Sequence, residues 1–281
     1  LVILMKNMLK YTILSLGITA CITSCQKVID INLKKAEQRY IVDALITDEQ
    51  GYNFVTISRS KPFDENNSFE RIYDATVWIK DLQDNISYPM TIGTFTTRYT
   101  NTALTARTGN SYELYVVIRE DTLTAVCTVP ETKVELDSIK IELSEFSRFL
   151  GRDIYVGVPV YKDPPGRGNY YLLRSYLNGL NTLSASYDSD EFIDGQVNKS
   201  PIFFRNINRE DSVAEFNNGD TLSVELFCIA KPVYEFYFTL GQNSSAALSN
   251  PANPRSNVYG KNVIGVFNAA TLSRKSIIAD Y

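Results

Sequence analysis

The sequence of 281 residues has no histidine, only four cysteines and no long block of basic residues. The absence of imidazole removes the commonest general base, the commonest metal ligand and every catalytic triad built on histidine. A formal charge of −4 without a basic block argues against a nucleic-acid partner. No nucleophile elbow, phosphate-binding loop or dinucleotide fingerprint occurs. We therefore expect neither a cofactor nor an enzymatic reaction.

The one long apolar run lies near the start of the chain and ends at two cysteines, Cys21 and Cys25. Two lysines precede it, and its apolar part stops near Ala20, which is the order of a secretory signal. It is shorter than the roughly 20 apolar residues that a membrane-spanning helix needs. The small residues Thr23 and Ser24 before Cys25 resemble the lipobox of bacterial lipoproteins.

We expect residues 1–24 to be a lipoprotein signal peptide and Cys25 to carry the lipid. Cys21 is the alternative, because Ile18 to Cys21 fits the same pattern almost as well. Both cysteines could instead be filler in an ordinary signal peptide. Lipidation at Cys25 leaves residues 25–38 as a tether and anchors the protein to a membrane, because two acyl chains suffice for stable anchoring.

Residues 39–130 are expected to form an N-terminal β-sandwich of the immunoglobulin-like or transthyretin-like kind. Apolar and polar residues alternate with a period of two in about seven short runs, such as ATVWIKD and SYELYVVIRE. Turn sequences such as DENNS and RTGNS separate these runs. This pattern predicts antiparallel strands with one buried face. Pro130, followed by a charged segment, marks the expected boundary.

Residues 131–281 are expected to form a second antiparallel β domain with one amphipathic helix, so the fold class is mainly β. The runs DIYVGVPVYKD and NYYLLRSYLNG flank the turn KDPPGRGN, which predicts a hairpin-like arrangement. From Pro232 the period changes to that of a helix, with Val233, Phe236, Tyr237 and Leu240 on one face.

The two remaining cysteines, Cys127 and Cys228, each lie on the apolar face of an alternating run. An exported location would permit a disulfide between them. They fall in different expected domains, so we favour two buried free thiols that act as small hydrophobic residues.

Four stretches together resemble a large family of Bacteroidota lipoproteins catalogued as domain of unknown function 4249. They are SNPANPRSNVYGKNVIGVFNAA, KDPPGRGNYYLLRSY, EFIDG and SCQKVIDINL. The resemblance covers nearly all of the chain after Cys25. It implies an outer-membrane lipoprotein, often encoded beside a TonB-dependent transporter, and it carries no catalytic residues over.

The segment PANPRSNVYG is the main candidate for a binding rim. Its functional interpretation places Arg255, Tyr259, Asn253 and Asn257 on an ordered loop at one end of a sandwich. Its structural interpretation, which we favour, is that the prolines and asparagines close turns and position the final strand.

A second candidate is the acidic segment YDSDEFIDGQ, which holds Asp188, Asp190, Glu191 and Asp194. Carboxylate oxygens are the ligands that calcium prefers, but the spacing departs from the EF-hand pattern. A solvated acidic loop without a metal is the favoured interpretation.

Three functions remain open at this stage. We favour a non-enzymatic, lipid-anchored outer-membrane protein that binds a partner, plausibly a TonB-dependent transporter. The first alternative is a hydrolase of envelope or exogenous polymers that uses two carboxylates. The second is a structural or adhesive surface protein.

Overall fold

The alternating sequences form the strands that their period predicts. In β7 (Ser111–Ile118), every second side chain from Tyr112 to Ile118 is buried, and the residues between them are only partly buried. The computed structural model describes residues 38–61, 69–93, 97–204, 216–245 and 253–281, so Cys21, Cys25 and Pro251 lie outside the described residues. Within these ranges the fold is mainly β, as expected.

Sixteen strands are described, in two sheets. Their bounds are β1 (Tyr40–Thr47), β2 (Phe54–Arg59), β3 (Glu70–Arg71), β4 (Thr76–Asp81), β5 (Ile86–Ile92), β6 (Tyr99–Thr100), β7 (Ser111–Ile118), β8 (Asp121–Thr128), β9 (Leu136–Leu143), β10 (Tyr155–Lys162), β11 (Tyr170–Leu177), β12 (Leu180–Ser189), β13 (Val197–Asn198), β14 (Thr221–Ile229), β15 (Val258–Tyr259) and β16 (Val263–Ile278). The larger sheet has the order β12-β11-β14-β16-β1-β2-β6-β5-β4-β7-β8-β15, with β3 paired to β2, and the smaller has the order β13-β10-β9.

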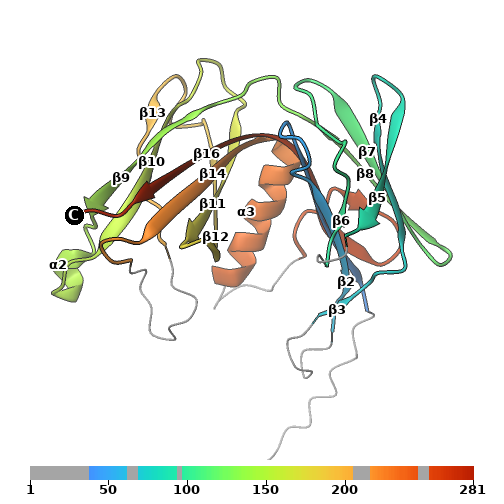
Figure 1. The fold of residues 1–281 in the computed structure, drawn as a ribbon, viewed down its shortest axis with the longest axis horizontal. Coiled ribbons are helices and arrows are strands. Elements are labelled where there is room, and N and C mark those ends of the chain that lie inside the picture. Colours follow the sequence, from blue (N-terminus) through green and yellow to red (C-terminus); the bar gives the residue numbers. More distant parts are fainter. Residues whose placement is uncertain (1–37, 62–68, 94–96, 205–215, 246–252) are drawn as a thin grey trace, which may run out of the picture. The chain divides into compact units, whose positions relative to one another are not determined.

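The 16-residue strand β16, near the C-terminus, lies beside the first described strand, β1, and connects the two halves of the fold (Figure 1). Its first half pairs with β1 in parallel, from Val263 opposite Tyr40 to Ala270 opposite Thr47. Its second half pairs with β14 antiparallel. The parallel pair differs from the purely antiparallel arrangement that the alternating runs predict. Figure 1 shows β4, β5, β7 and β8 on one side of β16, and β9, β10 and β13 on the other.

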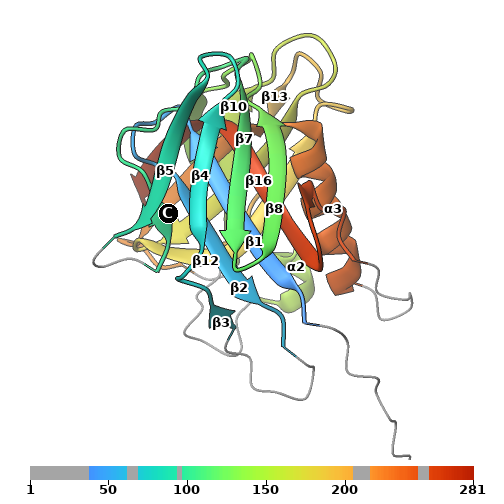
Figure 2. The ribbon, with the colours of Figure 1, turned by 90° about the vertical axis from the view of Figure 1, so that its right-hand side faces the viewer.

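Two hydrophobic cores result from this arrangement. The first lies between strands of the N-terminal half and β16, and it includes Ile46, Leu114 and Phe267. The second lies between the smaller sheet and β11 and β14, and it includes Tyr161 and Leu226. Figure 2, turned by a quarter of a circle, shows β4, β7 and β8 in front of β1 and β16. Both cores therefore depend on the same sheet.

A boundary near Pro130 remains a prediction. Residues 129–135 do connect β8 with β9, but the chain later returns to the first half. There β15 pairs with β8, and β16 pairs with β1. Residues 37–281 form one compact unit.

The predicted helix is present as α3 (Lys231–Ser245), with Pro232 in its first turn. Val233 and Phe236 belong to the first core and Tyr237 packs against it, which confirms the predicted apolar face for these three residues. Leu240, the fourth residue of the predicted face, is exposed. A second, short helix, α2 (Ser147–Leu150), connects β9 to β10. Among the described residues, neither helix has the length and apolar character needed to cross a membrane.

The predicted hairpin between β10 and β11 is wrong, because these two strands belong to different sheets. Pro164 and Pro165 have no N–H group to donate to a ladder, and Gly166 and Gly168 have φ values of 115° and 114°. The segment therefore crosses from one sheet to the other.

Gly265 shows why β16 needs a glycine beside β1. A Cβ atom built on Gly265 would lie 2.3 Å from the carbonyl oxygen of Val42, its partner in β1. Such a contact is far below van der Waals distance, so a larger residue would push the two strands apart. The backbones of β1 and β16 therefore approach closely at Gly265.

Candidate functional site

A cleft of about 280 Å³ opens where the connection between β8 and β9 passes over the start of β11 and of α3. We call it the seam cleft. It is lined by Gly109, Thr128, Val129, Pro130, Glu131, Thr132, Val134, Gly168, Asn169, Tyr170, Tyr171, Cys228, Ile229, Ala230 and Lys231. The connecting segment thus forms one wall, and the GNYY part of the DPPGRGNYY motif forms part of another.

The seam cleft has walls of mixed polar and apolar character and two charged residues, Glu131 and Lys231, both of which are exposed. The thiol of Cys228 also lies in its wall. Its Sγ accepts a hydrogen bond of 3.4 Å from the backbone N–H of Val134, and burial raises its pKa. A neutral, buried thiol is a poor nucleophile. This chemistry suits binding of a partly apolar ligand.

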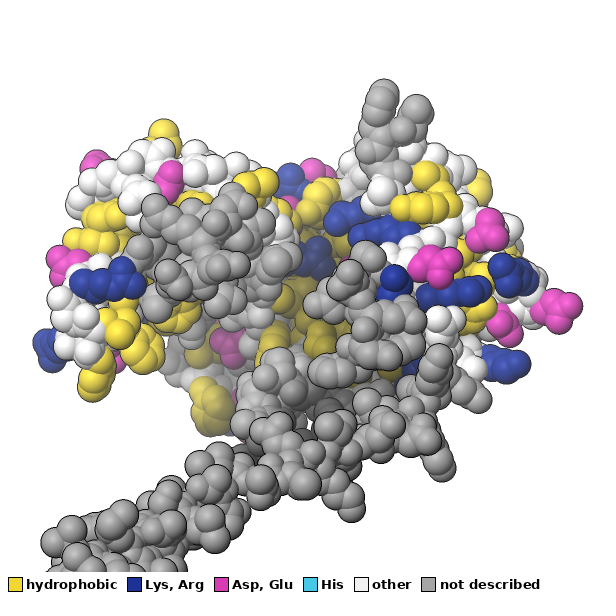
Figure 3. Space-filling model, turned by 90° about the horizontal axis from the view of Figure 1, so that it is seen from below, with side chains coloured by type: hydrophobic (Ala, Val, Ile, Leu, Met, Phe, Trp, Pro, Cys, Tyr) yellow, Lys and Arg dark blue, Asp and Glu magenta, His cyan; other side chains and the backbone are white. Residues whose placement is uncertain are grey.

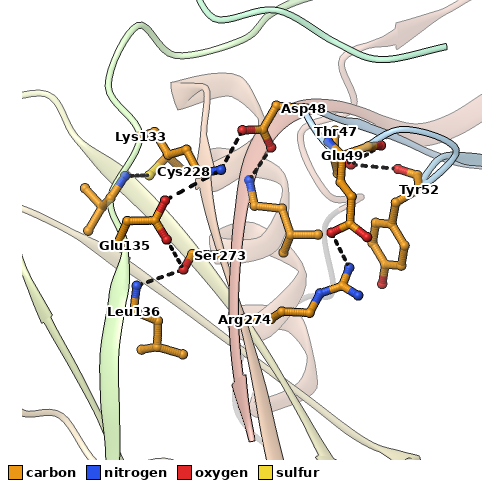
Figure 4. Close-up of polar contacts among 12 residues, drawn as sticks. Thr47, Asp48, Glu49, Tyr52, Lys133, Glu135, Leu136, Cys228, Ser273 and Arg274 are labelled. Carbon is orange, nitrogen blue, oxygen red and sulfur yellow. Dashed lines mark hydrogen bonds and ion pairs between the residues drawn. The ribbon is translucent and has the colours of Figure 1, made fainter.

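Behind the cleft, charged residues tie the connecting segment to β16 (Figure 4). Asp48, in the turn after β1, accepts a hydrogen bond of 2.8 Å from the backbone N–H of Leu272. Its other oxygen lies 3.0 Å from Nζ of Lys133, and Lys133 also lies 3.6 Å from a carboxylate oxygen of Glu135. These bonds join the β1–β2 turn, the connecting segment and β16 at one place.

Ser273 completes this attachment. Its hydroxyl donates to Glu135 at 2.7 Å and accepts from the backbone N–H of Leu136 at 2.9 Å (Figure 4). The connection between the halves is therefore fixed to β16 where it enters β9.

A second polar cluster surrounds Glu225 of β14. The carboxylate accepts hydrogen bonds from the hydroxyls of Tyr52 at 2.7 Å and Tyr176 at 2.8 Å. Arg274 lies 3.8 Å from Glu225, 2.9 Å from Glu49, and over the ring of Tyr52. Burial and the hydrogen bond to Glu225 raise the pKa of both phenols, so both remain protonated donors. This cluster holds the β1–β2 turn against β14 and β16.

A third cluster lies between the sheet and α3. Burial raises the pKa of Asp43, and Arg174 opposes that rise. Burial disfavours the charged guanidinium of Arg174, but nearby Tyr237 and Asp43 more than offset this and raise its pKa. The guanidinium carbon of Arg174 also lies 5.3 Å from the ring centre of Phe227. The cluster stabilises α3 on the sheet.

The sequence interpretation missed all of these clusters. A signal was nevertheless available, because Glu225 and Arg174 are single charges inside otherwise apolar strand sequences. A charge at such a position is seldom buried without a partner. The partners come from distant parts of the chain, so the sequence does not reveal them.

The four residues of the proposed rim separate into two kinds. Asn253, Arg255 and Tyr259 are exposed, whereas Asn257 is buried. The Asn257 side chain forms two hydrogen bonds of 2.8 Å with the backbone N–H and carbonyl of Phe267 in β16.

Ser256, beside Asn257, bonds to both backbone groups of Gly265. Arg255 lies 3.4 Å from Glu235 of α3, and Tyr259 pairs with Thr124 of β8. The segment thus links β8, β16 and α3, which is the contact expected of a segment that positions the final strand.

Two carboxylates of the acidic segment YDSDEFIDGQ accept hydrogen bonds from backbone N–H groups of the loop between β10 and β11. Asp190 is buried and accepts from the backbone N–H groups of Gly168 and Asn169 at 2.7 and 2.9 Å. Asp194 accepts from Gly166 at 2.7 Å. Burial raises the pKa of Asp188, while Glu191 is exposed. No group of three or more acidic or sulfur ligands among the described residues is arranged to hold a metal ion.

Cys127 and Cys228 are buried free thiols, as expected. Burial raises the pKa of Cys127 to about 11, and its sulfur accepts a bond from the backbone N–H of Ala269. Each thiol therefore fills space and accepts a hydrogen bond.

Comparison with known proteins gives one match. A family model described as Domain of unknown function (DUF4249) matches residues 26–276. No curated protein and no solved structure matches the chain.

Proposed function

The chain belongs to the family described as Domain of unknown function (DUF4249), and from that premise we propose that it is a lipid-anchored envelope protein that binds a partner. The proposed role is non-enzymatic. The observation that carries the binding role is the seam cleft, whose walls combine apolar and polar residues and whose two charged residues, Glu131 and Lys231, are exposed. Such sites use a few polar groups to orient a mostly apolar ligand.

The anchor is supported by the sequence around Cys25. The family match begins at Gln26, directly after this cysteine. An apolar signal before a lipidated N-terminal cysteine would anchor the protein in the cell envelope, and the resemblance to outer-membrane lipoproteins favours the outer membrane. The resemblance to envelope lipoproteins favours a TonB-dependent transporter as the partner.

A carboxylate-dependent hydrolase is less well supported. It would need two carboxylates at a suitable separation in one cleft. Among three of the best-formed clefts of the described residues, the seam cleft holds only Glu131 as an acidic lining residue, a second holds only Asp121, and the third has no acidic lining residue. This distribution favours binding over hydrolysis.

The anchor is tested by labelling the full chain with radioactive palmitate in a bacterium that processes lipoproteins. We expect Cys25→Ala to abolish labelling and Cys21→Ala to retain it. Labelling that survives Cys25→Ala and disappears with Cys21→Ala would move the anchor to Cys21. Labelling that survives in the double variant Cys21→Ala/Cys25→Ala would reject acylation at both cysteines.

Partner binding is tested by affinity purification of the tagged, full-length protein from detergent-solubilised membranes. Charge reversal by Glu131→Lys and Lys231→Glu should reduce recovery of a co-purified β-barrel protein without lowering the melting temperature. Lys199→Glu is the matched control, because Lys199 is also exposed but does not line the seam cleft. Equal recovery with all three variants would remove the cleft from the binding surface.

A further inference from the structure

The connection between β9 and β10 presents a group of large apolar side chains to solvent. We call this group the apolar tip; it consists of Leu143, Phe146, Phe149, Leu150 and Phe203, which are all exposed. The rings of Phe146 and Phe203 are 6.4 Å apart, so the two segments contact one another. Contiguous exposed apolar residues of this size mark an interaction site.

The turn that carries the apolar tip is well ordered. Ser147 is the buried residue of α2, and its hydroxyl accepts a hydrogen bond of 2.9 Å from the backbone N–H of Ile154. The backbone N–H of Ser144 donates to the carbonyl of Ile154 at 2.7 Å. Gly151, in the left-handed conformation, ends the helix. The fold therefore holds Phe149 and its neighbours outward.

The apolar tip lies on the side of the molecule where the described chain begins. Figures 1 and 2 both show α2, β3 and the start of β1 at the lower edge. Phe69 and Tyr73, which flank β3, are also exposed. The 13 residues from Gln26 to Gln38 can span at most about 45 Å, so an anchor at Cys25 would keep this side near a bilayer.

Three cationic residues lie near Gln38, where the described part of the chain begins. A cleft of about 230 Å³ is lined by Gln38, Arg39, Tyr40, Arg59, Asp121, Lys261 and Asn262, which include three cations and one acid. Figure 3, seen from below, shows Lys and Arg side chains on this face, interspersed with Asp, Glu and hydrophobic side chains. Cations next to exposed apolar groups are typical of surfaces that bind anionic lipids.

We propose that this face is the membrane-facing surface of the protein, with the apolar tip inserted among lipid chains and the cations around Gln38 against anionic headgroups. A bilayer is favoured over a protein partner because the apolar tip projects from a turn, and none of its five side chains except Phe203 borders any of the three clefts among the described residues. The orientation of the protein on the bilayer depends on the lipid anchor of the proposed function.

The first test measures insertion directly. The sequence has a single tryptophan, Trp78, so a Trp78→Phe background allows one probe to be placed at a chosen position. The probe is Phe149→Trp, and its matched control is Phe192→Trp, because the two side chains are 86% and 85% exposed. Phe192 lies in the loop that bonds to residues 166–169, beyond the end of β10 opposite to α2.

The full-length protein is reconstituted into vesicles of phosphatidylcholine and phosphatidylglycerol, with or without brominated acyl chains. We expect the emission of the probe at position 149 to shift to shorter wavelength and to be quenched by bromine. The probe at position 192 should keep the emission that it has in water. Equal behaviour of the two probes, or no change at position 149 in an anchored protein, would overturn the inference.

The second test separates the apolar tip from the anchor. The chain from Gln26 onward, which lacks both the lipidated cysteine and the apolar signal, is floated with the same vesicles, alone and with Phe149→Ser or Phe192→Ser. Loss of one aromatic side chain from the bilayer should lower the vesicle partition constant by about tenfold for Phe149→Ser, and the constant should be unchanged for Phe192→Ser. If no variant floats although the wild type is acylated, the anchor stands and the insertion is rejected. A wavelength shift at position 149 that requires an added protein would assign the face to a protein partner and overturn the inference.

Discussion

At the scale of residues, polar side chains of this protein satisfy backbone groups far away in the sequence. Asn257 bonds to both backbone groups of Phe267, and Asp48 accepts from the N–H of Leu272, 224 residues away. Because these atoms are buried, removing the side chain leaves the backbone without a partner, which costs more than the hydrogen bond contributes.

The change Asn257→Ala should lower the free energy of unfolding by about 2–4 kcal/mol, because it leaves a buried N–H and a buried carbonyl unpaired. Asn253→Ala is the control, since Asn253 is exposed and should change stability by less than about 0.5 kcal/mol. Urea unfolding measures both. An unchanged midpoint for Asn257→Ala would contradict the structural role of the PANPRSNVYG segment.

The thiol of Cys127 should make stability depend on pH under alkaline conditions. Burial raises its pKa from 9.0 to about 11, so above pH 9 the unfolded chain releases a proton that the folded chain retains. Stability from this group is therefore complete below pH 9 and falls by about 2–3 kcal/mol as the pH rises to 11.

The measurement is a series of unfolding curves between pH 8 and 11. Cys127→Ala should show a shallower loss of stability over this range, whatever its stability at pH 8. Buried tyrosines such as Tyr112 also have raised pKa values, so part of the slope should persist. Parallel curves for the wild type and the variant would exclude Cys127 as a source of the slope.

At the scale of elements, hydrogen bonds hold two loops of the second half together. The loop between β10 and β11 offers backbone N–H groups, and the loop between β12 and β13 supplies the carboxylates of Asp190 and Asp194. Buried Asp163 accepts from Tyr171 and from the N–H of Gly195, which joins the loops a second time. The carboxylates thus bind loop N–H groups that have no partner in a strand ladder, and they hold the two loops together.

Asp190→Ala should destabilise the fold by about 2–3 kcal/mol, because a buried carboxylate that accepts two partly buried hydrogen bonds is lost. Glu191→Ala should have little effect, since Glu191 is exposed. Thermal unfolding with added calcium or with EDTA should give one melting temperature, because Asp190 and Asp194 already bind backbone groups. A rise in melting temperature with calcium would restore the metal site as a hypothesis.

At the scale of the whole molecule, β16 makes the two halves depend on each other. It pairs with β1 and with β14, and it contributes to the core of the first half through Phe267. The polar clusters around Asp48 and Glu225 then fix the connecting segment and the first turn to the same strand.

A chain that ends at residue 130 should therefore not fold by itself, because it lacks β15, β16 and α3. We expect residues 26–130 to give no cooperative thermal transition, whereas the full chain unfolds in one transition. Circular dichroism during heating measures both. A cooperative transition of the fragment would show that the first half is an independent domain.

The seam cleft was only partly predictable. The motif DPPGRGNYY and the boundary at Pro130 were both noted in the sequence, and the structure places parts of both in the same cleft. Nothing in the sequence brings Lys231 and Cys228 to them, because that contact needs β14 to lie beside β11. The sequence does not reveal the apolar tip either, because it does not show whether Phe146 and Phe149 are exposed or buried in a core.

The sequence by itself determined the strands and the helix α3, because the period of apolar residues is a local property. A strand buries every second residue, and a helix buries every third or fourth, whatever the rest of the chain does. Only the tertiary structure decided that β16 pairs in parallel with β1 and that β10 and β11 enter different sheets. Local alternation specifies which face of a strand is buried, but it does not specify its neighbour. That choice depends on the packing of both cores and on side chains such as Asn257 and Asp190, whose partners are distant in the chain.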